Sequence, residues 1–220
     1  MRTDNPVINF LNKMTDLILL NFLFLLTSLP IVTMGASLTA MYAVNLRSIR
    51  YGDGYVVRTY FEAFKRNFKQ STLAWGIVLA VAALLYVDYM FFAQMQDFPF
   101  AKPMIIVSFA MGIICWIVAT WLFPVIAKMD DTLGRQIKNA AAFAFGYFIP
   151  YTLVCMLLQG GVFYLILTQI PALFVLAFIG CAVLTYVMSF FFYKAFSKVI
   201  REEPLGDDDP LYGARAKKKN

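Results

Sequence analysis

The stretch that decides the fold is NAAAFAFGYFIPYTLVCMLLQGGVFYLILTQIPALFVLAFIGCAVLTYVMSFFFY, residues 139–193, which contains no Asp, Glu, Lys or Arg. As a helix rising ~1.5 Å per residue it would measure about 80 Å, whereas the hydrocarbon core of a bilayer is ~30 Å thick. It therefore predicts two membrane crossings, residues 139–159 and 171–194. A turn that begins at Gln159-Gly160-Gly161 joins them.

Two further gaps between charged residues lie upstream, at 70–87 and 103–127. Each is long enough for one crossing, and they predict spans at 71–94 and 103–127. Of the 220 residues, 61% are hydrophobic and only 15% are charged, which is more apolar surface than one globular core can hide. We therefore expect a single all-α polytopic membrane domain over residues 1–200.

The first uncharged block, residues 17–46, is too long for one crossing and carries a corner at Pro30 and Gly35. Proline inside a helix removes a hydrogen bond and clashes with the preceding turn. The block is interpreted as a helical hairpin with spans at 10–29 and 35–50. The alternative is a single broken span.

The positions of the basic residues favour the hairpin, because Lys and Arg are retained on the cytoplasmic side of a membrane. With a hairpin, 18 of the 19 Lys and Arg residues lie on one side, and with a single span the number falls to 16. We expect about six helices in the cytoplasmic (inner) cell membrane with both termini inside, and no cleaved signal peptide. Residues 201–220 are expected to form a disordered charged cytoplasmic tail.

The segment 56–70 has the pattern of an amphipathic helix at the membrane surface, where apolar side chains meet acyl chains and basic ones meet anionic headgroups. A second interpretation is a docking helix for a protein partner. The candidate contact residues are Val57, Arg58, Phe61, Phe64, Lys65, Arg66, Phe68 and Lys69.

Asp88 is the charged residue that interrupts a predicted span. A carboxylate in a membrane is costly unless it is hydrated, paired or protonated. Three interpretations remain open: a water-accessible interfacial carboxylate, a ligand or proton site, and a structural pair with Lys102. Pro150, one turn after Gly146, predicts a kink within the span 139–159.

Several classes of chemistry have little support in this sequence. Histidine is absent, which excludes His-ligated metal sites and Ser-His-Asp or Cys-His nucleophiles. The three cysteines lie in apolar stretches and are interpreted as buried small hydrophobes. No catalytic residue, cofactor, metal ligand or nucleic-acid module is predicted, and the net charge of +6 is explained by topology.

The first seventy residues also resemble a known family, the YesL-like bacterial integral membrane proteins, a domain of unknown function. The resemblance is carried by Asn5-Pro6, by Leu29-Pro30-Ile31-Val32-Thr33-Met34-Gly35-Ala36-Ser37, by Asp53-Gly54-Tyr55-Val56, and by Phe61-x-x-Phe64-Lys65-x-Asn67-Phe68-Lys69-Gln70. It implies a bacterial inner-membrane protein with an accessory part in carbohydrate import by ABC transporters or in the regulation of that import.

Three functional hypotheses follow. The first is a non-enzymatic accessory protein that packs against the permease subunit of a sugar ABC importer. The second is an autonomous small-solute transporter or channel with a pathway near Asp88 and Pro150. The third is a membrane partner of a sensor kinase. An enzyme ranks last, because the carboxylates form no convincing acid–base pair.

Overall fold

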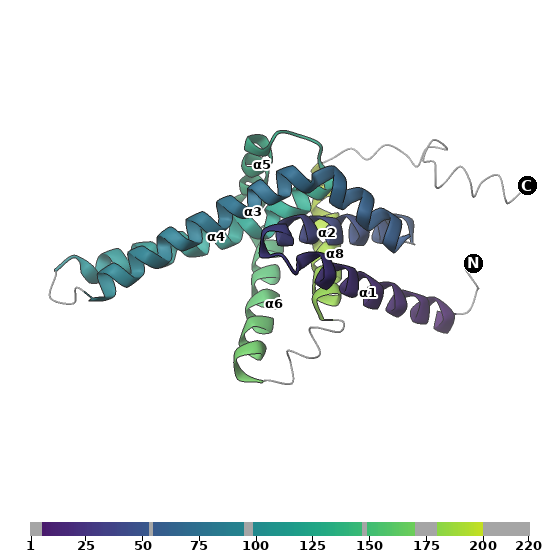
Figure 1. Ribbon diagram of the computed structural model, residues 1–220, viewed down its shortest axis with the longest axis horizontal. Coiled ribbons are helices and arrows are strands. Elements are labelled where there is room, and N and C mark those ends of the chain that lie inside the picture. Colours follow the sequence, from purple (N-terminus) through teal and green to yellow (C-terminus); the bar gives the residue numbers. More distant parts are fainter. Residues whose placement is uncertain (1–5, 53–54, 95–98, 147–148, 170–179, 200–220) are drawn as a thin grey trace, which may run out of the picture.

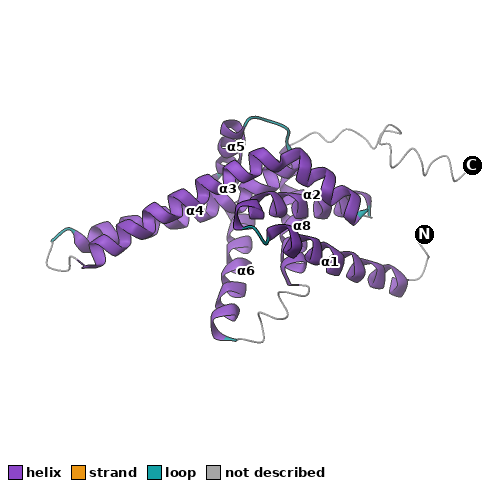
Figure 2. Ribbon diagram, in the orientation of Figure 1, coloured by secondary structure: helices purple, strands orange, loops and turns teal. Residues whose placement is uncertain are grey.

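The computed structural model describes residues 6–52, 55–94, 99–146, 149–169 and 180–199, and these ranges are almost entirely helical (Figures 1 and 2). The predicted tail, residues 201–220, lies outside them. The helices are α1 (Pro6–Ser28), α2 (Met34–Tyr51), α3 (Val56–Gln94), α4 (Ala101–Lys128), α5 (Leu133–Phe145), α6 (Ile149–Thr168) and α8 (Cys181–Val199), with a 3-10 turn, η1 (Ile31–Thr33), before α2.

Four of the described helices are long and apolar enough to cross a membrane: α1, α3, α4 and α6. This confirms the prediction of an all-helical multi-pass membrane protein. α2, which covers the span predicted at 35–50, is not among the four: it is long enough, but residues such as Arg47 and Arg50 make it too polar. Of the span expected at 171–194, α8 covers the second half and continues to Val199, and residues 171–179 lie outside the described ranges.

The helices cross in a compact centre and diverge from it (Figure 1). The second half of α3 and the first half of α4 run side by side as a long arm on one side of the molecule. α6 and α8 run in a direction that crosses this arm, and α1 leaves the centre on the opposite side. α2 lies in the middle and packs against α1, α3, α4 and α8.

The corner at Pro30 forms as predicted, with α1 ending at Ser28 and α2 beginning at Met34. The backbone N–H of Thr33 donates to the Pro30 carbonyl at 2.9 Å, and the Thr33 hydroxyl donates to the Thr27 carbonyl at 2.6 Å. These bonds satisfy carbonyl groups that the end of α1 leaves free. The corner is therefore held by its own side chains.

Gly35, in the first turn of α2, allows α2 and α3 to approach closely. A Cβ atom at this position would lie 2.5 Å from Trp75 Cβ and 2.6 Å from the Ser71 carbonyl oxygen, both on α3. Neither atom belongs to a flexible side-chain end that could move aside. Below this contact the Ser71 hydroxyl lies 2.9 Å from the Thr39 hydroxyl, which joins the two helices by a buried hydrogen bond.

The prediction of separate elements at 56–70 and 71–94 is corrected by the structure, because α3 is one continuous helix of 39 residues. Figure 1 shows it as an arch whose two halves slope in different directions from the centre of the molecule. No proline occurs between residues 56 and 94, so the helical hydrogen bonds continue through the bend. The amphipathic segment is thus a rigid extension of the span.

The span predicted at 139–159, with a kink at Pro150, is also corrected. α5 ends at Phe145, and a Cβ on the next residue, Gly146, would lie only 2.4 Å from the Ala142 carbonyl oxygen. Pro150 lies in the first turn of α6, where a missing N–H costs nothing. The chain therefore breaks between two helices instead of kinking within one.

The turn predicted at Gln159-Gly160-Gly161 is wrong, since α6 passes through these residues and ends at Thr168. A Cβ on either glycine would have no atom within 4 Å. In a bilayer a broken helix leaves backbone groups without partners at several kcal/mol each, whereas glycine in a helix costs only ~1 kcal/mol. The continuous helix therefore has the lower free energy in a bilayer.

Polar side chains within the apolar helices bond neighbouring helices, as isolated polar residues in membrane bundles do. Thr27 of α1 lies 2.9 Å from the Ser37 hydroxyl of α2 and 2.6 Å from the Tyr60 hydroxyl of α3. Asn45 of α2 donates to Thr185 of α8 at 3.1 Å. These bonds join α1 and α8 to the central helix α2, and α1 to α3.

An aromatic cluster around Trp121 of α4 forms the centre of the larger core. Trp121 is fully buried and stacks on Phe143 of α5, with ring centroids 5.5 Å apart. Phe192 and Phe196 of α8 meet the same indole edge-on at 4.7 and 6.4 Å. The indole N–H donates to Thr152 of α6 at 2.8 Å, so one side chain contacts three other helices.

Replacing Asn21 with leucine is expected to lower the free energy of unfolding by about 1–3 kcal/mol. The Asn21 side-chain oxygen accepts the backbone N–H of Ala182 at 3.0 Å, and that N–H belongs to the first turn of α8, which has no partner within its own helix. Thermal unfolding in mild detergent measures the change. Asn12→Leu, at an exposed position of the same helix, is the matched control and should unfold like the parent.

Candidate functional site

The segment 56–70 of α3 attaches to the rest of the protein by one narrow face. Val56, Tyr60, Ala63 and Asn67 are buried on this face. They recur every three or four residues, which is the spacing of one face of a helix. The prediction of an amphipathic helix did not identify this buried stripe, because it mixes small and polar residues with apolar ones.

The predicted contact residues lie on the other faces of the segment. Val57, Phe61 and Phe68 are 45, 38 and 37% exposed, and Phe64 is half-buried between the Tyr60 and Phe68 rings. The charged contact residues are exposed as well: Arg58, Lys65, Arg66 and Lys69. Asp53 and Gly54, the turn residues of the family motif, lie outside the described ranges.

The three kinds of side chain occupy three different sectors of the helix. At ~100° per residue, the aromatic stripe lies beside the buried stripe, and the basic stripe lies on the side opposite to it. Arg58, Lys65 and Lys69 therefore point away from the body of the protein, whereas Arg66 lies about 90° from the buried stripe, on the flank that faces the α4–α5 loop. The aromatic rings point sideways, where lipid or another protein can contact them.

The loop between α4 and α5 packs against the end of this segment. The Gln70 amide donates to the Asp131 carbonyl at 2.6 Å, and the Arg66 guanidinium lies 3.9 Å from the Asp130 carboxylate. On the other side of the loop, Gln136 of α5 donates to the Met129 carbonyl at 2.9 Å. The loop thus contacts α3 on one side and α5 on the other.

The ion pairs on this side of the molecule are exposed. Arg58 and Glu62 of α3 lie 2.8 Å apart with side chains 62 and 59% exposed. Arg135 and Asp131 lie 3.3 Å apart, with the arginine side chain 75% exposed. Such surface pairs contribute at most ~1 kcal/mol, so most of the positive charge stays available for a partner.

Asp88 is half-buried in the arm and accepts a hydrogen bond from the Ser108 hydroxyl of α4. The proposed pair with Lys102 is not formed. A hydroxyl donor offsets part of the cost of a carboxylate among apolar helices. Asp88 therefore joins the two helices of the arm through Ser108, whereas of the three interpretations of Asp88 only the pair with Lys102 named a partner.

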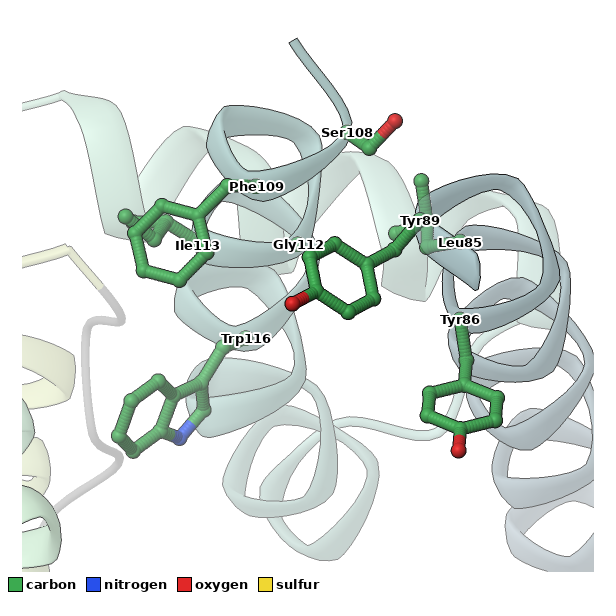
Figure 3. Close-up of a pocket in the computed structure, with 8 residues that line it drawn as sticks. All are labelled: Leu85, Tyr86, Tyr89, Ser108, Phe109, Gly112, Ile113 and Trp116. Atoms are coloured by element: carbon green, nitrogen blue, oxygen red, sulfur yellow. The ribbon is translucent and has the colours of Figure 1, made fainter. Parts of the chain in front are cut away.

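A pocket of about 280 Å³ lies beside this contact, between α3 and α4. Figure 3 shows Tyr89 reaching from α3 toward α4 in front of Gly112, with Ser108 and Trp116 at opposite ends. The Trp116 N–H donates to Gln159 of α6 at 2.7 Å. The lining is otherwise apolar and aromatic, and Pro150 lies in another part of the fold, at the start of α6.

The structure thus brings the residues of the segment 56–70 together with the α4–α5 loop and leaves Asp88 apart from them. In the described ranges, no group of three or more Cys, Asp or Glu side chains is arranged to hold a metal ion. The missed residues are Gln70, Gln136 and the backbone of residues 129–131. A sequence pattern does not show that a loop sixty residues further along the chain docks here.

Comparison with known protein families places part of the chain. Residues 17–89 match the model of DUF624, a protein family of unknown function. The match covers α2 and the two predicted sites on α3, the amphipathic segment and Asp88. No curated protein and no solved structure matches the chain.

Proposed function

We propose that this membrane protein is a non-enzymatic accessory protein that binds another membrane protein through the exposed face of α3. One observation carries the proposal: a helix fixed to the fold by one stripe presents an aromatic stripe and a basic stripe outward. Aromatic residues and arginine are enriched where proteins bind each other. The corner at Pro30 is the second contact candidate; Leu29, Ile31 and Val32 are exposed there, but residues 17–46 carry no charge, so the proposal rests on α3.

The partner we propose is the permease subunit of a carbohydrate ABC importer in the cytoplasmic membrane. This part of the proposal is supported by the resemblance of residues 5–70 to the YesL-like family. A sensor kinase that regulates carbohydrate uptake is the alternative partner, and the same surface would serve it. An autonomous transporter is less favoured, because Asp88 is bonded to Ser108 beside an apolar pocket.

Affinity purification of the tagged protein from its own membranes, in mild detergent, tests the proposal. We expect a permease and its ATPase to be recovered with the parent protein. A surface variant carrying Phe61→Ser, Lys65→Gln, Phe68→Ser and Lys69→Gln should reduce their recovery about tenfold or more, since a few aromatic and basic residues dominate most interfaces.

The control is a variant of the arm, Leu84→Ala with Val87→Ala, which alters two side chains that are 70 and 64% exposed. It should recover the same proteins as the parent. Recovery of the parent alone, or equal recovery by the surface variant, would contradict the proposal. Recovery of a kinase in place of the permease would select the alternative partner.

A further inference from the structure

Basic residues from two helices gather around the α4–α5 loop. Arg66 of α3 approaches Asp130 at 3.9 Å, and Arg135 of α5 approaches Asp131 at 3.3 Å. The next exposed bases along these helices are Lys69 and Lys138. We call the four bases Arg66, Lys69, Arg135 and Lys138 the basic surface.

The acids of the loop leave this surface with excess positive charge. There are two acids, Asp130 and Asp131, for four bases, and the Asp131 carboxylate also accepts the Thr132 N–H at 2.7 Å. The side chains of Arg66 and Arg135 are 57 and 75% exposed. The face is therefore suited to an acidic occupant.

The last described helix reaches α5, whose first turns carry Arg135 and Lys138. Phe196 of α8 packs edge-on against Phe143 of α5 at 5.2 Å, and Lys198 lies 5.9 Å from the Tyr151 ring. Val199, the next residue, is the end of α8 and the last described residue. The chain thus continues from a point beside the carboxyl end of α5.

The chain that follows carries an acidic run, preceded by Arg201 and followed by bases only from Arg215 onward, and this run can reach the basic surface. Glu202, Glu203 and Asp207–Asp209 occupy the first ten positions after Val199. Extended chain spans ~3.3 Å per residue, or roughly 25–30 Å to the aspartate run. From Phe143 back to Arg135 along α5 is only about 12 Å.

We propose that the acidic run 202–209 of this chain binds its own basic surface. The inference goes beyond the proposed function, because the contact forms within one chain and needs no partner. Each exposed ion pair is weak, but a short tether gives an effective concentration of about millimolar. The run would therefore cover the basic surface until a more acidic partner displaces it.

Site-specific photo-crosslinking of the full-length purified protein tests this contact. A benzoylphenylalanine at Leu205, between the two acidic groups, is activated in nanodiscs of phosphatidylcholine, and the products are mapped by mass spectrometry. We expect cross-links to the α4–α5 loop, α5 and residues 61–74. They should fall about threefold or more near 1 M salt, where the Debye length is ~3 Å.

Charge variants then separate a specific contact from chance proximity. Lys69→Gln with Arg135→Gln and Lys138→Gln should reduce the cross-link about threefold or more, whereas Lys102→Gln, at the far end of α4, should leave it unchanged. Unfolding temperatures confirm that the variants are folded. Cross-links to other parts of the protein, or an unchanged cross-link yield in the charge variant, would overturn the proposal.

The same measurement in nanodiscs that contain phosphatidylglycerol decides between the acidic run and the membrane. Retention of the cross-link supports the proposal. If the cross-link is lost in these nanodiscs and cross-links to lipid appear instead, the basic surface binds anionic headgroups, and the proposal is overturned. Neither result depends on whether a permease co-purifies.

Discussion

Trp121→Ala is expected to lower the free energy of unfolding by about 3–5 kcal/mol, one of the two largest effects of a single change in this protein. The indole is fully buried and stacks on Phe143 at 5.5 Å. It also donates to the Thr152 hydroxyl at 2.8 Å. The alanine variant loses the ring contacts and the hydrogen bond to Thr152, whose hydroxyl keeps its bond to the Ala144 carbonyl.

Circular dichroism during thermal unfolding, together with titration by a denaturing detergent, measures this loss without relying on tryptophan fluorescence. Trp116→Ala is the matched control, because its indole is 42% exposed and contributes mainly one hydrogen bond, to Gln159 at 2.7 Å. We expect about 1 kcal/mol for the control. Equal losses for the two variants would show that the aromatic cluster is not the centre of the core.

Gly35→Ala is the second change with a large expected effect, although it adds only one methyl group. The new Cβ would lie 2.5 Å from Trp75 Cβ and 2.6 Å from the Ser71 carbonyl oxygen. Overpacking of this kind usually costs about 1–3 kcal/mol, and more where backbone must shift. Because both atoms belong to α3 close to its backbone, we expect at least the upper end of that range.

Gly76→Ala supplies the comparison for that experiment. Gly76 is a glycine of α3, and a Cβ there would have no atom within 4 Å. Alanine at an unhindered helical position stabilises by up to ~1 kcal/mol. The two substitutions should therefore move the unfolding midpoint in opposite directions. A neutral Gly35→Ala variant would mean that α2 and α3 do not approach as closely as the structure places them.

The membrane class, the corner at Pro30 and the helical segments 56–70 and 71–94 were predictable from sequence, because they follow from charge spacing and from proline chemistry. The ends of the helices in the second half of the chain could not be predicted from the sequence. Gly160 and Gly161 resemble a turn in a sequence, yet in a bilayer the backbone must keep its own hydrogen bonds, so the helix passes through them. Gly146 and Pro150 together make the actual break.

At the candidate site, too, some features could be predicted from the sequence and others could not. The aromatic and basic residues of α3 were predictable because their helical spacing depends only on local sequence. The buried stripe that fixes the helix, and the loop that docks at Gln70, depend on contacts between distant parts of the chain. The partner of Asp88 was likewise missed, since a serine such as Ser108 carries no charge to signal a pair.

The continuity of α3 has a mechanical consequence. At ~1.5 Å per residue its 39 residues extend over about 58 Å along the helix, and contacts near Gly35 hold it close to its middle. α3 can therefore tilt as one body about its contact with α2. A partner that pulls on the amphipathic end would tilt the opposite end, and α4 would move with it because Ser108 is bonded to Asp88. We therefore expect occupation of the amphipathic end of α3 to displace the arm that α3 and α4 form at the opposite end.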